Sequence, residues 1–265
     1  MNILKIMNKV TAKLQGGIGN MLFQIAVAYA YSKKFNNELM LSKDDAVIVH
    51  QNIDTYSNNI LKNIEFSNFI NPTIQHSEKG FHYQEIPNYN SSVVLYGYFQ
   101  SEKYFKDYED DIRDLFMSYE IELKDEIKKL LDNENTCSIH VRRGDYLKSP
   151  NHHPTQSMNY YMKTIKQMPK DSVFLIFSDD IEWCKQNFPD LPEKFRFIEG
   201  NKDYEDLYIM SRCTNNIICN STFSWWGAWF NRNIDKIVVA PSVWFGPAYS
   251  GHDTKDLYCD NWIKI

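Results

Sequence analysis

The second half of the chain alternates short apolar runs with helical stretches, and this alternation most narrows the folds open to it. We predict five strands there: CSIHV (137–141), VFLIF (173–177), FRFI (195–198), NIIC (216–219) and KIVVA (236–240). Helices are predicted near 157–168, 180–188, 203–213 and 223–231. Strands that alternate with helices form βαβ units with a parallel sheet. The second half is therefore expected to be a Rossmann-like α/β domain.

The first half repeats this pattern less regularly. We predict strands at 9–14, 38–41 and 92–99, an apolar helix over 21–35 and a charged helix over 101–117. The polar stretch 44–90 gives no assignment. The charged segment 124–135 marks the predicted boundary between an N-terminal α/β domain (1–133) and a C-terminal domain (134–265). Two such domains would enclose a cleft, where ligands commonly bind.

Charge and cysteine usage narrow the classes of protein. The formal net charge is -5, so there is no basic footprint for nucleic acid. The five cysteines are odd in number and show no CxxC spacing, which favours reduced thiols and a cytoplasmic location. Residues 1–15 carry charges where a signal peptide needs an apolar run, and the apolar stretch 21–31 is too short to span a bilayer. We expect neither secretion nor membrane insertion, and peripheral attachment stays open.

The segment HVRRGDY (140–146) ends the first strand of the second half. Alternate residues of a strand share a face, so His140 and Arg142 stand side by side at the carboxyl end of a parallel strand. Open α/β sheets bind ligands at that end. The guanidinium of Arg142 is a planar fork of donors that matches a diphosphate. The alternative is structural, namely a surface ion pair between Arg143 and Asp145 beside a buried, hydrogen-bonded His140.

Two acidic residues, Asp179 and Asp180, follow the next strand. A carboxylate there can accept two hydrogen bonds from the N1–H and N2–H of guanine. Asp179 with Glu182 also fits a capping box for the following helix, which explains it without a ligand. Asp180 suits the dipole of the same helix. Both interpretations stay open on the residues alone.

Three hydroxyl side chains follow the strand 216–219 and open an apolar helix: Ser221, Thr222 and Ser224. A helix N-terminus presents free N–H groups and partial positive charge, which suits a phosphate. N-capping by Ser221 or Thr222 needs only one hydroxyl, so three hydroxyls favour anion binding. The tryptophans that follow lie at helical spacing and are expected in the core.

A glycine-rich segment, QGGIGN (15–20), lies between the first strand and the first helix. Its four loop candidates for contact with a substrate are Gly16, Gly17, Gly19 and Asn20. It is neither the dinucleotide fingerprint nor a P-loop. The tight loop brings the backbone close to a substrate or to a neighbouring strand. The chain also contains no Asp-x-Asp and no His/Cys/Asp cluster that predicts a metal site.

Together these segments resemble the bacterial α-1,2-fucosyltransferases of glycosyltransferase family 11. The match runs nearly end to end, and its segments occur in the family's order: QGGIGNMLFQIAVAYAYSKKF, YGYFQSEKYF, SIHVRRGDYL, IFSDDIEWCKQNF and ICNSTFSWWGAWFN. HVRRGDY is shared across fucosyltransferases, whereas the first and last segments narrow the family.

The resemblance implies a GT-B fold, in which two Rossmann-like domains face each other across a cleft. The second domain would bind the donor and the first most of the acceptor. It implies an inverting transfer of L-fucose from GDP-β-L-fucose to the 2-hydroxyl of a terminal β-galactoside, without a cofactor or an obligatory metal. By position, Arg142 would contact the β-phosphate, His140 would hold the nucleotide and Asp180 would read guanine. The pyrophosphate would be lined by Ser221, Thr222 and Ser224.

A base must take the proton of the attacking hydroxyl. Asp145 is the first candidate because it shares a loop with Arg142, and the two histidines that follow are second candidates. Contacts with the acceptor are expected from His152, His153, Tyr98 and Gln100. Two alternatives remain, namely a fucosyltransferase of another linkage such as α-1,6, and a non-catalytic protein that binds a GDP-sugar.

Overall fold

The computed structural model describes residues 7–43, 46–48, 52–67, 72 and 74–265. Residues 1–6, on which part of the signal-peptide argument rests, lie outside the described residues. The chain forms two compact units. Unit 1 comprises Met1–Tyr119 and Asp253–Tyr258, and unit 2 comprises Glu120–His252 and Cys259–Ile265. The division therefore falls at 119/120, not at the expected 133/134, because the charged segment 124–135 forms a helix of unit 2.

Unit 2 is built on a parallel sheet of six strands in the order β12-β11-β10-β7-β8-β9. Its strands are β7 Thr136–Val141, β8 Val173–Ser178, β9 Phe195–Phe197, β10 Asn215–Ile217, β11 Val238–Ala240 and β12 Ile263–Lys264. Its helices are α3 Asp125–Asn133, α4 Met158–Ile165, α5 Ile181–Asn187, α6 Asp203–Arg212 and α7 Thr222–Phe230. The chain winds outward from β7 to β9 and then returns to β10, on the other side of β7. This is the doubly wound Rossmann order.

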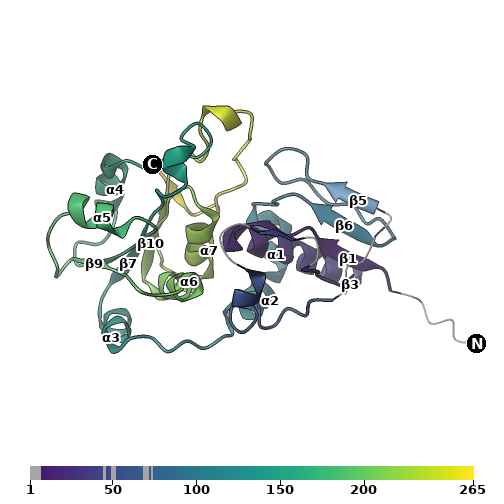
Figure 1. The fold of residues 1–265 in the computed structure, drawn as a ribbon, viewed down its shortest axis with the longest axis horizontal. Helices are drawn as coiled ribbons and strands as arrows, with labels where there is room; N and C mark the ends of the chain where they lie inside the picture. Colours follow the sequence, from purple (N-terminus) through teal and green to yellow (C-terminus); the bar gives the residue numbers. More distant parts are fainter. Residues whose placement is uncertain (1–6, 44–45, 49–51, 68–71, 73) are drawn as a thin grey trace, which may run out of the picture. The chain divides into compact units, whose positions relative to one another are not determined.

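Helices cover both faces of the unit 2 sheet (Figure 1). Cys137, Ile139 and Val141 point to the face covered by α4 and α5, and the α3 and α6 face receives the alternate residues of β8. Strand β8 is buried on both faces, which is why its sequence is apolar throughout. The predicted facing of residues 137–141 is confirmed. His140 therefore lies on the opposite face, beside Phe223 of α7.

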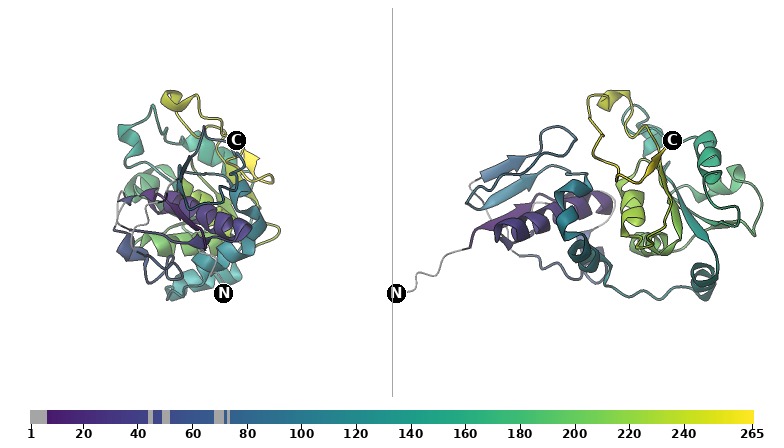
Figure 2. Two further views of the ribbon diagram at one scale, coloured as in Figure 1. Left: turned by 90° about the vertical axis from the view of Figure 1, so that its right-hand side faces the viewer. Right: turned by 180° about the vertical axis from the view of Figure 1, so that it is seen from behind.

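Unit 1 has a smaller parallel sheet in the order β3-β1-β6-β5, beside a two-stranded pair of β2 and β4. Its strands are β1 Lys9–Ala12, β2 Gln15–Gly16, β3 Glu38–Leu39, β4 Val47–Ile48, β5 Ile74–Ser77 and β6 Val93–Tyr96. Its helices are α1 Ile18–Phe35 and α2 Glu109–Met117. The long, largely buried α1 packs along the sheet (Figure 2). Two parallel sheets in two units confirm the α/β, GT-B-type class, and the cleft stays a prediction.

The charged helix predicted over 101–117 is wrong in its first half. That half forms two 3-10 turns, η2 Glu102–Tyr104 and η3 Lys106–Tyr108, before α2 begins. Phe105, between the two turns, has φ -139°, outside the helical range. Its ring is buried against Phe23 of α1, so tertiary packing fixes it there. Within the described ranges, no helix is both long and apolar enough to cross a membrane.

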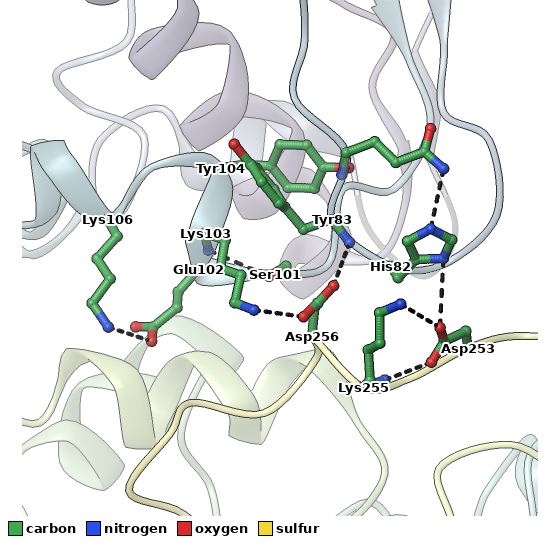
Figure 3. A network of polar contacts seen from close by, with 11 residues as sticks. His82, Tyr83, Ser101, Glu102, Lys103, Tyr104, Lys106, Asp253, Lys255 and Asp256 are labelled. Carbon is green, nitrogen blue, oxygen red and sulfur yellow. Dashed lines mark hydrogen bonds and ion pairs between the residues drawn. The ribbon is translucent and has the colours of Figure 1, made fainter.

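The segment Asp253–Tyr258 returns from the C-terminal part of the sequence to unit 1. Figure 3 shows how its carboxylates attach it. Asp256 is buried and accepts hydrogen bonds from Nζ of Lys103 at 2.6 Å and from the backbone N–H of Tyr83 at 3.0 Å. Asp253 lies 3.0 Å from Nζ of Lys255 at the surface. The buried carboxylate of Asp256 therefore ties this segment to two other stretches of unit 1.

Replacing Asp256 with alanine should lower the free energy of unfolding by about 1–3 kcal/mol, because it removes a buried carboxylate that accepts from the Tyr83 backbone N–H and from Nζ of Lys103. Urea unfolding measures the loss, and hydrogen exchange at the Tyr83 amide should accelerate in the same variant. Lys255→Ala is the matched control, since exposed ion pairs contribute little. Equal stability of the two variants would contradict the attachment.

Candidate functional site

Three polar loops of unit 2 follow the carboxyl ends of neighbouring strands β10, β7 and β8. The segment HVRRGDY continues β7, Asp179 and Asp180 continue β8, and the residues after β10 lead into α7. The chain reverses its winding direction between β7 and β10. Open α/β sheets bind ligands at such a switch point. The three predicted donor-binding segments thus meet at one edge of one sheet.

Arg142 lies between two carboxylates. Its Nη2 and Nε lie 2.8 and 3.0 Å from Oδ1 of Asp145, and its Nη1 lies 3.1 Å from Oδ2 of Asp179. A quarter of the Arg142 side chain is exposed, and half of the Asp145 side chain. The guanidinium is held in place on several donors and still reaches the surface. An incoming anion would have to displace at least one of these carboxylates.

The neighbouring Arg143 turns to a different partner. Its Nε donates to Oδ2 of Asp180 at 2.9 Å, and its guanidinium lies over the ring of Trp183, 3.9 Å from the centroid. The surface ion pair weighed as the alternative, Arg143 with Asp145, is therefore not the one formed. Asp145 pairs with Arg142 instead, because the two arginines leave the strand on opposite sides.

The cap of α5 also differs from the prediction. Asp180 is the N-cap residue and accepts from the backbone N–H of Trp183, so the capping box of Asp179 with Glu182 is wrong. Asp179 instead accepts from the backbone N–H of Arg143 at 2.9 Å. A Cβ on Gly144 would lie 2.6 Å from Oδ2 of Asp179, so this carboxylate requires a glycine there. Asp179 ties the loop after β7 to the end of β8.

His140 is buried at the end of β7. Its Nδ1 lies 3.2 Å from Sγ of Cys219, two residues beyond the end of β10. Burial, helped by the nearby charge of Arg142, lowers the pKa of His140 to about 3. The imidazole is therefore neutral at pH 7 and adds no charge to the site.

The hydroxyls at the start of α7 are unequal. Ser221 occupies the N-cap position, yet among the described residues its side chain makes no capping hydrogen bond. Ser224 is buried and donates to the backbone oxygen of Ser221 at 3.2 Å. Thr222 is half-buried and the most exposed of the three. The capping alternative is not realised by Ser221, and the expected tryptophan core is confirmed, since Trp225, Trp226 and Trp229 are buried.

Tyr146 and Asn220 link the loops of this edge, although neither was predicted to have a role. The hydroxyl of Tyr146 donates to the backbone oxygen of Asn220 at 2.9 Å, and the Asn220 amide donates to the oxygens of Pro154 and Trp244 at 3.0 Å. Their positions within HVRRGDY and NSTFSWW were the sequence features that could have indicated such a role. Loops after β7, β10 and β11 are thereby fixed to one another.

The two candidate histidines lie on these fixed loops. The ring of His153 stacks on Tyr146 with centroids 5.0 Å apart, and His152 meets Tyr249 edge-on at 4.9 Å. Burial lowers the pKa of His153, against the opposing charge of Asp145. Both rings therefore belong to an aromatic cluster next to the Arg142 loop.

The remaining candidates belong to unit 1. Helix α1 begins at Ile18, so Gly19 and Asn20 lie in its first turn and not in the expected loop. Gly16 has φ +85°, in the left-handed region that favours glycine. The side-chain oxygen of Asn20 accepts a hydrogen bond from the side-chain amide of Gln100 at 3.0 Å. This contact joins the glycine-rich segment to the segment YGYFQSEKYF. Tyr98 lies in the same turn as Gln100 and is 37% exposed.

Asp206 on α6 is a further perturbed group in unit 2. Burial raises its pKa to about 7, although the Asn201 amide donates a hydrogen bond to it at 3.0 Å. Its sequence position gave no signal, since an acidic residue in a first helical turn usually suits the dipole. A carboxyl that stays partly protonated near neutral pH makes stability pH-dependent.

Asp206→Asn removes this titration. Because the folded pKa is raised, the folded state holds more protons than the unfolded state between pH 3.8 and about 7. The free energy of unfolding of the parent should therefore fall relative to the variant over that window, by roughly 2–4 kcal/mol. His140 acts with the opposite sign between about pH 3 and 6.5, so the difference between the two proteins is the quantity to measure. A difference in unfolding free energy between the two proteins that stays constant over this pH range would contradict the assignment.

Within residues 7–43, 46–48, 52–67, 72 and 74–265, no group of three His, Cys, Asp or Glu side chains is placed to hold a metal ion. All five cysteines are free and buried.

Two relatives from Escherichia coli match over almost their whole length. The chain is 33% identical to an alpha-1,2-colitosyltransferase, with 98% of this chain and 99% of the relative covered. It is 30% identical to the O-antigen biosynthesis glycosyltransferase WbnK, over 95% of this chain and 99% of the relative. Among solved structures, a mutant of Arabidopsis thaliana FUT1 in complex with GDP matches at 12% identity and a TM-score of 0.46, over 96% of this chain and 75% of that one. The fucosyltransferase NodZ from Bradyrhizobium matches at 11% identity and a TM-score of 0.45, over 83% and 91%.

The model of the family described as glycosyl transferase family 11 matches residues 4–265. That range includes both units and every segment that meets at the switch point of unit 2. The resemblance inferred from the motifs is confirmed, and this chain belongs to glycosyl transferase family 11.

Proposed function

We propose that this protein transfers L-fucose from GDP-β-L-fucose to the 2-hydroxyl of a terminal β-galactoside, forming an α-1,2 linkage with inversion. The observation that carries the proposal is the Arg142 guanidinium, held by Asp145 and Asp179 at the switch point of a Rossmann-type sheet. The full-length relationship to an alpha-1,2-colitosyltransferase supports the same linkage.

Arg142 stabilises the leaving group. As the bond between fucose C1 and the β-phosphate oxygen breaks, positive charge develops on the sugar and negative charge on GDP. A diphosphate that displaces Asp145 meets a planar fork of donors already located at this edge, and those donors stabilise the growing negative charge. The first amides of α7 and the Thr222 hydroxyl supply further donors for the diphosphate. No metal is needed for this step.

Asp145 is the proposed base. In the ligand-free protein its Oδ1 is engaged by Arg142. A diphosphate that draws the guanidinium away releases this carboxylate, which then accepts the proton of the galactose 2-hydroxyl while that oxygen forms the new bond to C1. Donor binding would thereby activate the base. His140, neutral and buried, holds the nucleotide. Asp180 accepts hydrogen bonds from guanine with a carboxylate that it shares with Arg143.

The test is a transfer assay with GDP-fucose and lactose, N-acetyllactosamine or a galactosyl-N-acetylhexosamine, in EDTA, with the product linkage determined by NMR. We expect an α-1,2-fucoside at an undiminished rate. An α-1,6 product would move the chain to the other linkage. GDP binding without transfer or donor hydrolysis would favour a non-catalytic sugar-nucleotide-binding protein.

GDP-colitose is the second candidate donor, because the relative named for colitose transfer is 33% identical over nearly the full chain. Colitose is fucose without its 3-hydroxyl, so the two donors differ in one hydrogen-bonding group. A site built to bond that hydroxyl rejects the deoxy sugar strongly, whereas an apolar site discriminates weakly. Competition between the two donors in one assay decides which is preferred.

A further inference from the structure

The turn after β6 in unit 1 contains a buried acceptor atom without a partner. Gln100 is 7% exposed, and its Nε2 donates to Oδ1 of Asn20 at 3.0 Å. Its Oε1 is buried and, among the residues that the structure describes, receives no hydrogen bond. Native proteins keep few such atoms because each one destabilises the fold. This oxygen therefore requires an explanation.

The same turn has a strained backbone and is held by hydrogen bonds to a carboxylate. Phe99, next to Gln100, has φ +50°, a region that bulky residues rarely adopt, and its side chain is fully buried. The carboxylate of Glu78 accepts from the backbone N–H groups of Tyr98 at 2.8 Å and Phe99 at 3.1 Å. Burial raises the pKa of Glu78, although both N–H groups oppose the rise. A side chain on Gly97 would collide with Glu78.

The turn also packs against Tyr104, which Figure 3 draws together with Tyr83 and Asp256. Tyr104 packs edge-on against the ring of Phe99 at 5.3 Å and against Tyr83 at 4.9 Å. Asp256 holds Tyr83 and Lys103, the latter three residues beyond Gln100. Contacts from three separate stretches of chain thus fix the position of one glutamine.

This turn lies where a ligand is expected in unit 1. Strand β1 stands between β3 and β6, and the chain passes from β1 to β3 on one side before β5 and β6 form the other side of the sheet. Ligands bind beyond the carboxyl ends of strands at such a reversal. Tyr96 is the last residue of β6 and Tyr98 follows it, and they are 40% and 37% exposed. Aromatic faces of this kind pack on the C–H groups of sugars.

We propose that Gln100 contacts a hydroxyl of the acceptor sugar through Oε1, and that Glu78 is a positioning residue that holds the strained turn. The inference rests on the proposed function, since it assigns the acceptor to this edge of unit 1. The terminal bond of a glutamine side chain rotates over a broad range, so the amide can turn its oxygen toward a ligand while the turn stays fixed.

Gln100→Met tests the contact against a matched variant, Gln24→Met. Gln24 is also fully buried at this edge, but its Oε1 accepts from Gln15 at 2.9 Å and its Nε2 donates to Gly97 at 3.2 Å. We expect Gln24→Met to lower the unfolding midpoint more than Gln100→Met does, because within the described part of the chain the Gln24 amide makes three hydrogen bonds and the Gln100 amide makes one. Gln100→Met should raise the acceptor KM about tenfold and leave the donor KM and the hydrolysis of the donor alone unchanged.

Acceptors that lack single hydroxyls identify the partner. With the 3-, 4- and 6-deoxygalactosides, the analogue without the recognised hydroxyl should give the same KM with the parent and with Gln100→Met. For Glu78, the acceptor KM should rise from parent to Glu78→Gln to Glu78→Ala, because glutamine keeps one accepting oxygen.

An unchanged acceptor KM in Gln100→Met would overturn the inference. So would a loss of stability equal to that of Gln24→Met, since it would mean that a buried water satisfies the oxygen. A parent protein that transfers sugar to no galactoside would instead reject the proposed function, and this outcome is visible before any variant is made.

Discussion

Arg142→Lys should lower the rate of sugar transfer by about 10²–10³. Lysine keeps the positive charge but loses the planar fork, so it cannot bond the diphosphate with parallel donors. The loss should fall on kcat more than on the donor KM, because charge on GDP grows only as the glycosidic bond breaks. Initial rates over a range of GDP-fucose concentrations, with the galactoside saturating, measure both parameters.

Arg143→Lys is the matched control. Arg143 makes the same kind of contacts one residue away, with Asp180 and the ring of Trp183, and neither contact involves Arg142. We expect a change below about tenfold in rate, with a lower unfolding midpoint from the weaker stacking. If the two lysine variants lose rate equally, the loop and not the Arg142 guanidinium is what matters. A full rate in Arg142→Lys would remove the role in leaving-group stabilisation.

Asp145→Asn should lower the transfer rate by about 10²–10⁴, the range that general base catalysis supplies. The amide still accepts a hydrogen bond from Arg142 but takes no proton. In the parent, the kcat–pH profile should show an acid limb, because a protonated base cannot accept the hydroxyl proton. That acid limb should be absent from the residual activity of the variant, and the kcat–pH profile of each protein checks this.

Two further measurements separate the role of base from that of positioning Arg142. GDP affinity should stay near that of the parent in Asp145→Asn, because a diphosphate replaces the carboxylate as the partner of Arg142. His153→Gln should keep most activity, since His153 is stacked in the aromatic cluster. Loss of GDP binding in Asp145→Asn, or an acid limb that survives the substitution, would give Asp145 a structural role.

The sequence predicted the fold of unit 2 well because one periodicity dominates it. Strand β8 is apolar throughout and lies second from the sheet edge, and the alternate facing of residues 137–141 follows from strand geometry alone. The secondary structure of unit 1 was harder to predict from the sequence. Phe105 leaves the helical range because its ring packs on Phe23, a contact more than eighty positions away that no local pattern contains.

The site was predictable as a set of segments but not as a set of contacts. Motifs at strand ends placed Arg142, Asp179 and the start of α7 at one edge. Which of two adjacent aspartates caps α5 depends on the loop after β7, whose backbone claims Asp179. Pairing of Arg142 with Asp145 likewise depends on the direction in which each arginine leaves the strand. These choices are made by neighbouring loops in space, so a single stretch of sequence does not contain them.

The central claim is that Arg142 passes from two carboxylates to the diphosphate of the donor. A crystal structure of the protein with GDP tests it most directly. We expect the guanidinium within hydrogen-bond distance of the β-phosphate, with the bond to Asp145 broken and no cation on the diphosphate. Arg142 still paired with Asp145 and Asp179, beside a diphosphate bound elsewhere or through a metal ion, would contradict the account.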